Sequence, residues 1–201
     1  MNFILFGDSY STYLGKIPEG NRCYYGTKRF DGAPVVTSAH KTWWGRLLAY
    51  TGANLVQNES FSGSSVCKTG YSDYDENTSF VARAEPYFQN GFFAEHEIDT
   101  AIVFGGTNDA WSESPLGEVH GTDLYEVLPA FRHLLTRLKA QNLRVICIVN
   151  CDLPEALTDG VCAICAEISA ECVRLSGIEK VNGHPTERGM EQIFNQIKPL
   201  F

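Results

Sequence analysis

Four short motifs contain the residues of this chain that could together catalyse a reaction. Ser9 ends a Gly-Asp-Ser turn, Gly63 lies in Ser-Gly-Ser, Asn108 in Gly-Gly-Thr-Asn-Asp, and His184 in Gly-His-Pro. A hydroxyl nucleophile, a glycine with an accessible backbone N–H, an amide donor and an imidazole base are the groups that acyl transfer requires. Each motif alone is common in turns, so the prediction depends on whether the fold brings the four together.

Alternating strand and helix patterns indicate the elements that could position these motifs. Strands are predicted at 3–6, 54–57, 100–104, 144–149 and 177–181, and helices at about 40–50, 79–88, 123–141, 159–176 and 186–198. The third and fourth strands are continuous apolar runs, which are typical of parallel strands covered on both faces. The last helix has Thr186 as its expected cap and Glu187 in its first turn. The alternation predicts a doubly wound α/β domain with a five-stranded parallel sheet.

The motifs follow the predicted strands, so a parallel sheet would place them on one rim. In a flavodoxin-like strand order, 2-1-3-4-5, the first and third strands are neighbours at the switch point, where ligands bind. Ser9 follows the first strand, and we predict that it is the nucleophile. The oxyanion hole would consist of the backbone N–H groups of Ser9 and Gly63 and the side-chain amide of Asn108. As the base, His184 would have to reach back across three strand spacings, roughly 14 Å.

The four blocks, in this order, resemble those of the SGNH hydrolases, the GDSL family of esterases and lipases. The matching residues are Ser9, Gly63, Asn108 and His184, and the resemblance spans residues 7 to about 190. It implies a three-layer α/β/α sandwich and a serine-dependent carboxylic ester hydrolase that acts through an acyl-enzyme. It implies no metal and no organic cofactor.

One position departs from this family pattern. An aspartate usually stands three residues before the histidine and holds the imidazole in the correct tautomer, but here that position is Val181. We therefore predict a Ser9–His184 dyad. A backbone carbonyl, a water, or another side chain would then orient the imidazole, and the candidate side chains are those of Glu179, Asp152 and Glu187.

Two long polar segments that contain tyrosines, 10–38 and 64–78, are expected near the active-site rim of this single domain, 1–201. Long loops in a compact domain are usually functional or disordered. Tyr10 follows the nucleophile and Trp111 follows the Asn108 motif, so both are candidates for lining the pocket. The aromatic residues could stack on sugar rings, hold an acyl chain or simply pack.

The overall composition limits the partners. The chain has 201 residues and a formal net charge of −8, which argues against a nucleic-acid or anionic-membrane partner. No window of about 18 apolar residues exists, so no membrane span is predicted. No basic segment precedes the first strand, so no signal peptide is predicted and a cytoplasmic location is expected, although a chain trimmed of its signal would look identical. The expected partner is a small-molecule ester.

The seven cysteines, an odd number spread over strand and helix patterns, indicate reduced thiols rather than a disulfide framework. Cys162-Ala-Ile-Cys165 has the spacing of a zinc or redox site. It lies in a helical pattern without a second Cys/His pair nearby, so we predict core packing.

The function predicted from these features is ester hydrolysis, with a carbohydrate ester as one candidate substrate. A thioesterase or an acyltransferase would use the same site. A catalytically silent carbohydrate-binding protein on the same scaffold is a different alternative, and Val181 is its best support. A flavodoxin-like nucleotide-binding protein is a weaker alternative, since the Gly-Gly-Thr-Asn turn lacks the lysine of a phosphate-binding loop.

Overall fold

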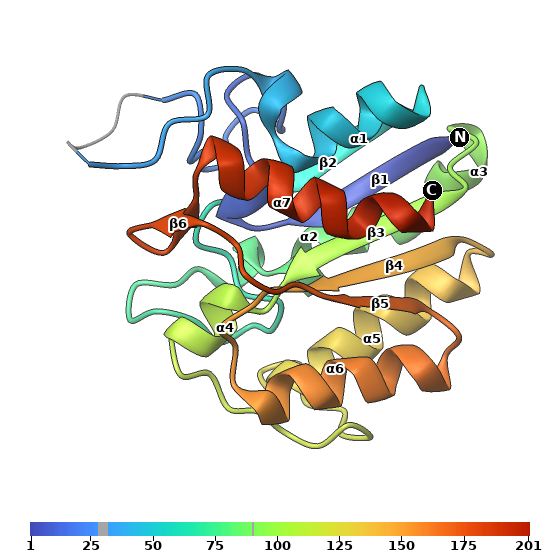
Figure 1. Cartoon of the computed structure of the whole chain (residues 1–201). Helices are drawn as coiled ribbons and strands as arrows, with labels where there is room; N and C mark the ends of the chain where they lie inside the picture. Colours follow the sequence, from blue (N-terminus) through green and yellow to red (C-terminus); the bar gives the residue numbers. More distant parts are fainter. Residues whose placement is uncertain (28–31, 90) are drawn as a thin grey trace.

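The computed structural model describes residues 1–27, 32–89 and 91–201, so part of the predicted 10–38 loop, including Phe30, lies outside the described residues. The main sheet has five parallel strands in the order β2-β1-β3-β4-β5, which confirms the flavodoxin-like order. The strands are β1 (Asn2–Gly7), β2 (Asn54–Ser60), β3 (Thr100–Gly105), β4 (Arg144–Val149) and β5 (Glu171–Arg174). Their carboxyl ends meet at the left of Figure 1, where the long loops also lie.

Helices cover both faces of this sheet and make the predicted three layers (Figure 1). The longer helices are α1 (Trp43–Thr51), α5 (Val127–Ala140), α6 (Glu155–Glu167) and α7 (Glu187–Ile197). Short helices are α2 (Phe80–Ala84), α3 (Phe92–Glu95) and α4 (Thr107–Trp111). Single 3-10 turns occupy Ser9–Ser11, Ala39–Lys41, Glu76–Thr78, Glu85–Phe88 and Lys198–Leu200.

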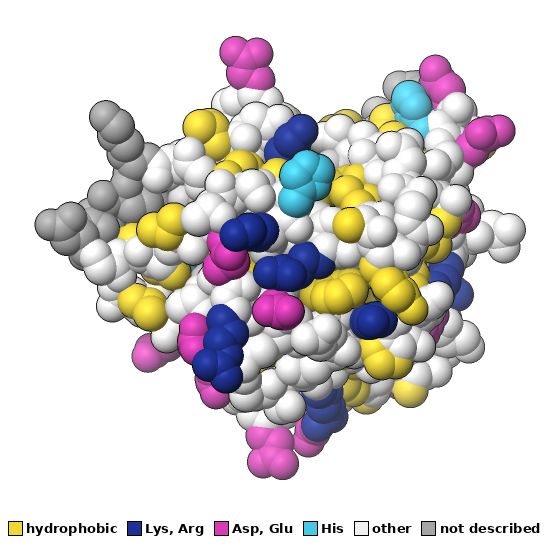
Figure 2. Space-filling view, turned by 45° about the horizontal axis from the view of Figure 1, so that its top comes forward, with side chains coloured by type: hydrophobic (Ala, Val, Ile, Leu, Met, Phe, Trp, Pro, Cys, Tyr) yellow, Lys and Arg dark blue, Asp and Glu magenta, His cyan; other side chains and the backbone are white. Residues whose placement is uncertain are grey.

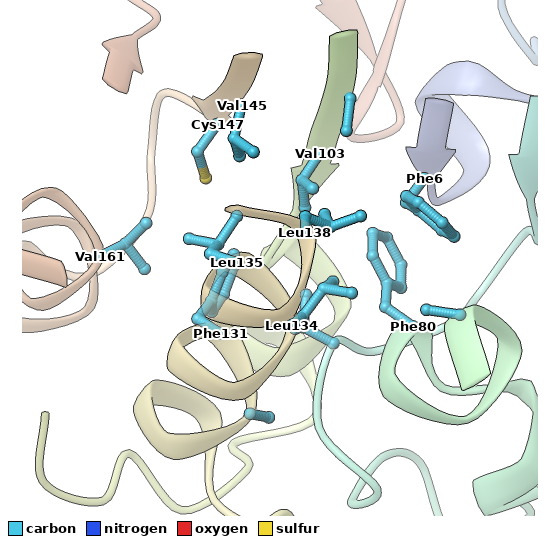
Figure 3. Packing of buried hydrophobic residues seen from close by; sticks show 14 of the residues in the cluster. Phe6, Phe80, Val103, Phe131, Leu134, Leu135, Leu138, Val145, Cys147 and Val161 are labelled. Atoms are coloured by element: carbon cyan, nitrogen blue, oxygen red, sulfur yellow. The ribbon is translucent and has the colours of Figure 1, made fainter. Parts of the chain in front are cut away.

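Successive side chains of the strands enter two separate cores, because side chains alternate across a sheet. Phe3 and Leu5 of β1 pack in the cluster that contains the buried residues of α1 and α7. Ile4 and Phe6 pack in the other cluster, with α2, α5 and α6. Figure 3 shows Leu134, Leu135 and Leu138 of α5 among the side chains of β3 and β4, and Phe80 beside Phe6. Burial on both faces explains why β3 and β4 are continuous apolar runs.

The helix that follows the last functional motif begins as predicted. The Thr186 hydroxyl accepts a hydrogen bond from the N–H of Gly189 (3.1 Å), and Glu187 lies in the first turn of α7. An N-terminal cap of this kind satisfies a backbone donor that the helix itself cannot pair. The cap fixes where the chain leaves the rim of the sheet.

The fifth strand is not where the sequence pattern placed it. We predicted a helix over 159–176 and a strand over 177–181, but α6 ends at Glu167 and β5 is Glu171–Arg174. Ser169 has a left-handed backbone conformation (φ 56°), which ends the helix early. The short strand is polar because it lies at the sheet edge, where Glu171 pairs with Arg144 (2.6 Å) of the neighbouring strand.

The segment predicted as the fifth strand instead enters a small hairpin. β6 (Lys180–Val181) pairs antiparallel with β7 (His184–Pro185). The two residues between them, Asn182 (φ 49°) and Gly183 (φ 76°), both have the positive φ that a type I′ turn requires. Asn-Gly is a strong hairpin signal in a sequence, so this error could have been avoided. His184 therefore lies on a hairpin beyond the sheet.

The cysteines of the Cys-x-x-Cys motif pack as predicted. Cys165 is buried in the core between α6 and the sheet, and Cys162 packs against the same cluster, with its Sγ 2.7 Å from that of Cys172. None of the seven cysteines, all of which lie among the described residues, forms a disulfide bond.

The surface drawn in Figure 2 mixes Lys and Arg with Asp and Glu, so this face presents no extended patch of one sign. Ion pairs such as Lys41–Glu187 (2.7 Å) and Arg132–Glu167 (2.6 Å) join opposite charges on the surface. In the part of the chain that the structure describes, no helix has both the length and the apolar character needed to cross a bilayer.

Candidate active site

Ser9 stands at the turn where β1 leaves the sheet. The preceding Gly7 has no room for a side chain, since a Cβ there would lie 2.5 Å from the Cβ of Ser11 and 2.6 Å from the Oγ of Ser60. The Asp8 carboxylate accepts a hydrogen bond from the N–H of Tyr10 (2.9 Å) and caps the 3-10 turn that begins with Ser9. A strand end, a glycine and a capped turn thus hold the serine in one position.

The Ser9 hydroxyl and the His184 imidazole are in hydrogen-bond contact. The distance from Ser9 Oγ to His184 Nε2 is 3.0 Å, and the other ring nitrogen, Nδ1, lies 3.1 Å from the backbone carbonyl oxygen of Asn182. A carbonyl can only accept, so Nδ1 carries the proton in the neutral ring and Nε2 is left to accept from the serine. This is the tautomer that a general base requires.

The three carboxylates considered as partners of His184 are engaged elsewhere. Asp152 pairs with Lys180 Nζ (3.1 Å), and Glu187 pairs with Lys41 Nζ (2.7 Å). The hydrogen bond from Lys41 is the main cause that lowers the pKa of Glu187 to about 2. Glu179 accepts from the Thr186 hydroxyl. The Asn182 carbonyl, and none of these carboxylates, lies against Nδ1. A backbone carbonyl was one of the predicted alternatives.

Tyrosines from the segment after β1 hold the histidine hairpin. Tyr24 stacks on the imidazole of His184, with the ring centroids 3.7 Å apart and the planes within 5°. The Tyr25 hydroxyl donates to the carbonyl of Pro185 (2.7 Å), and the Tyr10 hydroxyl donates to that of Gly183. Residues 10–25 therefore hold His184 in three ways: they bind the residue before it, the residue after it and one face of its ring.

The same segment is tied back to the nucleophile. The Thr12 hydroxyl donates to the carbonyl of Ser9 (3.0 Å) and accepts from the N–H of Tyr24 (2.9 Å). One threonine thus connects the turn that carries the serine to the tyrosine that covers the base. This short path links the position of Ser9 to that of the ring stacked on His184.

Asn108 lies at the start of α4, with its amide oriented by two partners. Its Nδ2 donates to the carbonyl of Ser64 (2.9 Å), and its Oδ1 accepts from the Tyr71 hydroxyl (3.0 Å). An amide nitrogen carries two hydrogens, so a second one is available to a bound oxyanion. Asn108 therefore has a side-chain donor to offer on the rim where it was predicted.

Gly63 and Ser9 can each offer a backbone N–H. Gly63 has a φ of 88°, a left-handed conformation that favours glycine, and of the described residues none accepts a hydrogen bond from its N–H. The N–H of Ser9 opens a 3-10 turn, where the first donors have no partner within the turn. The chain after β2 is joined to the end of β1 by a hydrogen bond from the N–H of Phe61 to Gly7 O (3.1 Å).

Asp8 and Asp109 brace these loops through hydrogen bonds to the backbone. The Asp109 carboxylate accepts from the backbone N–H groups of Val66 (2.9 Å) and Cys67 (3.1 Å), which fixes the loop after Gly63 against α4. Both carboxyl groups are buried. Burial raises the pKa of Asp109 above its usual value and raises the pKa of Asp8 to about 7.

The two residues predicted to line the pocket have different positions. Trp111 is 46% exposed and its ring centroid lies 5.9 Å from that of the His184 ring, so it borders the site. Tyr10 is completely buried beneath the hairpin, so its prediction as a pocket-lining residue is wrong. The residue after the nucleophile turns inward because its ring packs on Phe104 of β3 (5.7 Å between centroids).

Sequence reasoning assigned no role to two tyrosines that the structure places at the site, Tyr24 and Tyr71. Their segments were expected near the rim, but nothing in a loop sequence indicates which side chain points inward. In the described part of the chain, no group of three or more His, Cys, Asp or Glu residues is arranged to hold a metal ion.

Comparison with known proteins places the sequence and fold of this chain in one family. The chain matches the family model of the GDSL-like lipases/acylhydrolases over residues 1–201. A protein described as a GDSL-like lipase from Bacteroides ovatus has a similar structure, with a TM-score of 0.86 and 34% sequence identity over 99% of this chain and 96% of that one. One with the same description from Bacteroides uniformis has a TM-score of 0.87 and 37% identity over 99% and 94% of the two chains.

A more distant structure shares the fold alone. The acetyl xylan esterase from Geobacillus stearothermophilus is 13% identical, with a TM-score of 0.53 over 98% of this chain and 93% of that one. Among curated proteins, none matches this chain.

Proposed function

Because the chain belongs to the GDSL-like lipase/acylhydrolase family, we propose that it is a serine-dependent carboxylic ester hydrolase that acts on small-molecule esters. The observation that carries the proposal is the 3.0 Å contact between Ser9 Oγ and His184 Nε2. A serine and a histidine paired in this way form the unit that converts a weak hydroxyl into a nucleophile.

In the first half of the reaction, His184 takes the proton of Ser9 as the oxygen attacks the ester carbonyl. The carbonyl oxygen becomes an oxyanion, which the backbone N–H groups of Ser9 and Gly63 and the amide of Asn108 stabilise. The protonated imidazole then gives its proton to the leaving alcohol, and the acyl group stays on Ser9. Water, activated by the same imidazole, attacks the acyl-enzyme and releases the acid. Removal of one oxyanion donor typically costs about 3–4 kcal/mol of barrier.

The proposal is tested with 4-nitrophenyl acetate and a fluorophosphonate probe. The wild-type protein should give a burst of nitrophenol and become labelled on Ser9, whereas Ser9→Ala and His184→Ala should lose both. Ser11→Ala is the matched control: Ser11 is buried two residues away, and its loss should leave the activity unchanged. Full activity of Ser9→Ala would overturn the proposal.

We propose acetylated carbohydrates as the substrate class. Supporting features are the exposed ring of Trp111 beside the imidazole and the fold shared with an acetyl xylan esterase. A panel of esters that varies the acyl length and includes acetylated sugars tests this. Faster reaction with long acyl chains, with thioesters, or with transfer to an added alcohol would instead favour a lipase, a thioesterase or an acyltransferase. Sugar binding without fluorophosphonate labelling would favour a silent binding protein.

A further inference from the structure

A pocket of about 230 Å³ adjoins the catalytic histidine on the side of β4. Its walls are Trp111, residues 150–153 after β4, and Lys180 and Gly183 of the histidine hairpin. Gly183 directly precedes His184, and a Cβ on Gly183 would lie 2.7 Å from the Trp111 ring. The pocket therefore adjoins the hairpin that carries His184, and it shares Trp111 with the border of the candidate site.

The direction of proton transfer indicates which half of the ester this pocket faces. In ester hydrolysis the imidazole that deprotonated the serine returns the proton to the leaving oxygen. The alcohol half must then lie beside the imidazole, while the acyl half lies beyond the serine. The volume is below the roughly 300–1,000 Å³ of pockets for drug-sized ligands, so one small ring is a suitable occupant.

The walls combine an aromatic face with an ionised acceptor. Trp111 is half exposed, and the Asp152 side chain is 78% exposed while Lys180 Nζ holds it at 3.1 Å. The hydrogen bond from Lys180 is the main cause that lowers the pKa of Asp152, so this carboxylate is charged at neutral pH and can only accept. An alkyl chain could pack on the Trp111 ring, but it would offer no hydrogen-bond donor to this carboxylate. A neutral ring with several hydroxyl groups satisfies both walls.

The polar wall is fixed before any ligand binds. Lys180 is only 13% exposed, and its Nζ also donates to Asn150 Oδ1 (3.0 Å). Asn150 in turn donates to the Thr107 hydroxyl (3.1 Å) at the start of α4. Asp152 has a φ of 68°, a left-handed conformation that is unfavourable for a residue with a Cβ. The surrounding contacts thus hold the carboxylate at the pocket mouth against its local preference.

We propose that this pocket binds the alcohol half of the substrate and that this half is a sugar ring. Trp111 stacks on the ring, and Asp152 accepts hydrogen bonds from its hydroxyl groups. The inference rests on the proposed ester hydrolysis, and it adds the place and orientation of the sugar: the acyl group is removed from it, so the sugar leaves first and the acyl group remains on Ser9.

Two acetate esters with different alcohol halves test the inference. The first is an acetylated methyl xylopyranoside, and the second is ethyl acetate, which has no ring for the pocket. Trp111→Ala and Asp152→Asn should each lower kcat/KM for the sugar acetate by about tenfold and change kcat/KM for ethyl acetate less than twofold. The loss in Asp152→Asn is that of a charged hydrogen-bond acceptor, and the loss in Trp111→Ala is that of a stacked ring. Glu155→Gln, an exposed carboxylate just outside the pocket, is the control.

Equal losses with both acetates, or no loss with the sugar acetate, would overturn the inference. Binding of the unacetylated methyl xylopyranoside to the Ser9→Ala variant, followed by Trp fluorescence, gives an independent readout that needs no hydrolysis. Binding that Asp152→Asn weakens supports the pocket even if the wild-type protein hydrolyses neither ester, and in that case the proposed function alone fails. No binding to the Ser9→Ala variant overturns the pocket.

Discussion

The imidazole of His184 is fixed on two edges and one face. Ser9 Oγ and the Asn182 carbonyl lie at its two nitrogens, and the ring of Tyr24 covers it in a parallel stack. The two hydrogen bonds lie in the plane of the imidazole, so they do not prevent the ring from rotating about the line that joins its nitrogens. The stacked ring of Tyr24 opposes that rotation. The stack therefore does part of what orienting groups do in serine hydrolases: it keeps Nε2 pointed at the hydroxyl.

We expect Tyr24→Leu to lower kcat by about 2- to 12-fold, the free energy of an aromatic pair, with little change in KM. Tyr24→Phe keeps the ring and should restore kcat, which separates orientation of the base from a loss of folding. Steady-state kinetics on 4-nitrophenyl acetate measures both. Wild-type kcat in Tyr24→Leu would contradict the orienting role of Tyr24.

Glu179→Gln should keep most of the activity, because the Glu179 carboxylate binds Thr186 and not the imidazole.

Among the elements, α2 supplies the cation that joins the ends of β1 and β2. Arg83 Nη2 donates to Gly7 O (3.2 Å) and to Ser64 Oγ (3.1 Å), and Nη1 pairs with Glu59 Oε1 (3.1 Å). Both side chains of the ion pair are less than 10% exposed, at 7% and 8%. The carbonyl that Arg83 holds belongs to Gly7, two residues before Ser9, so this helix supports the candidate site.

Arg83→Met should lower the free energy of unfolding by about 3–5 kcal/mol, because Glu59 would remain buried without its partner. Urea denaturation at neutral pH measures the change. Adding Glu59→Gln to Arg83→Met removes the unpaired charge and should recover part of the loss. A single variant as stable as the wild type would show that the pair is not effectively buried in solution.

Among the elements, the main sheet was largely predictable from the sequence, whereas the hairpin that carries His184 was not. The apolar runs of β3 and β4 have few other stable arrangements, and parallel strands necessarily bring Ser9, Gly63 and Asn108 to one rim. β5 lies at an edge, carries Glu171 and Arg174, and so lacks the apolar signal. The hairpin of His184 depends on positive φ at Asn182 and Gly183, a turn property that a search for apolar strands overlooks. Tyr24 and Tyr71 lie on loops, whose inward side chains follow from tertiary packing.

For the whole molecule, the buried carboxyl of Asp8 makes stability depend on pH. Its folded pKa is about 7, against 3.8 for an exposed aspartate, mainly because burial disfavours the charged form. A raised folded pKa means that the folded chain binds the proton more tightly than the unfolded chain. The contribution is therefore fully present below about pH 4 and is lost as the pH rises through 7, by at most about 4 kcal/mol. Burial shifts Asp109 in the same direction.

Asp8→Asn should make the protein more stable than the wild type at pH 8 and nearly equal at pH 4, since the amide oxygen can still accept from Tyr10 and carries no charge. Urea unfolding at the two pH values measures this. Asp123→Asn is the matched control, because Asp123 accepts the same type of hydrogen bond from Tyr125 (2.9 Å) but is exposed. Equal pH slopes for the wild type and Asp8→Asn would contradict the prediction.

The contact between Ser9 and His184 joins residues 175 positions apart. At a synthesis rate of about 5–20 residues per second, roughly 9–35 s separate the two on the ribosome. Strand β1 is made before this interval and β2 to β5 within it, so most of the sheet can fold before the histidine exists. Under the proposed mechanism, a growing chain thus displays Ser9 without its base, and we expect activity to arise late, when the hairpin docks onto Tyr10, Tyr24 and Tyr25.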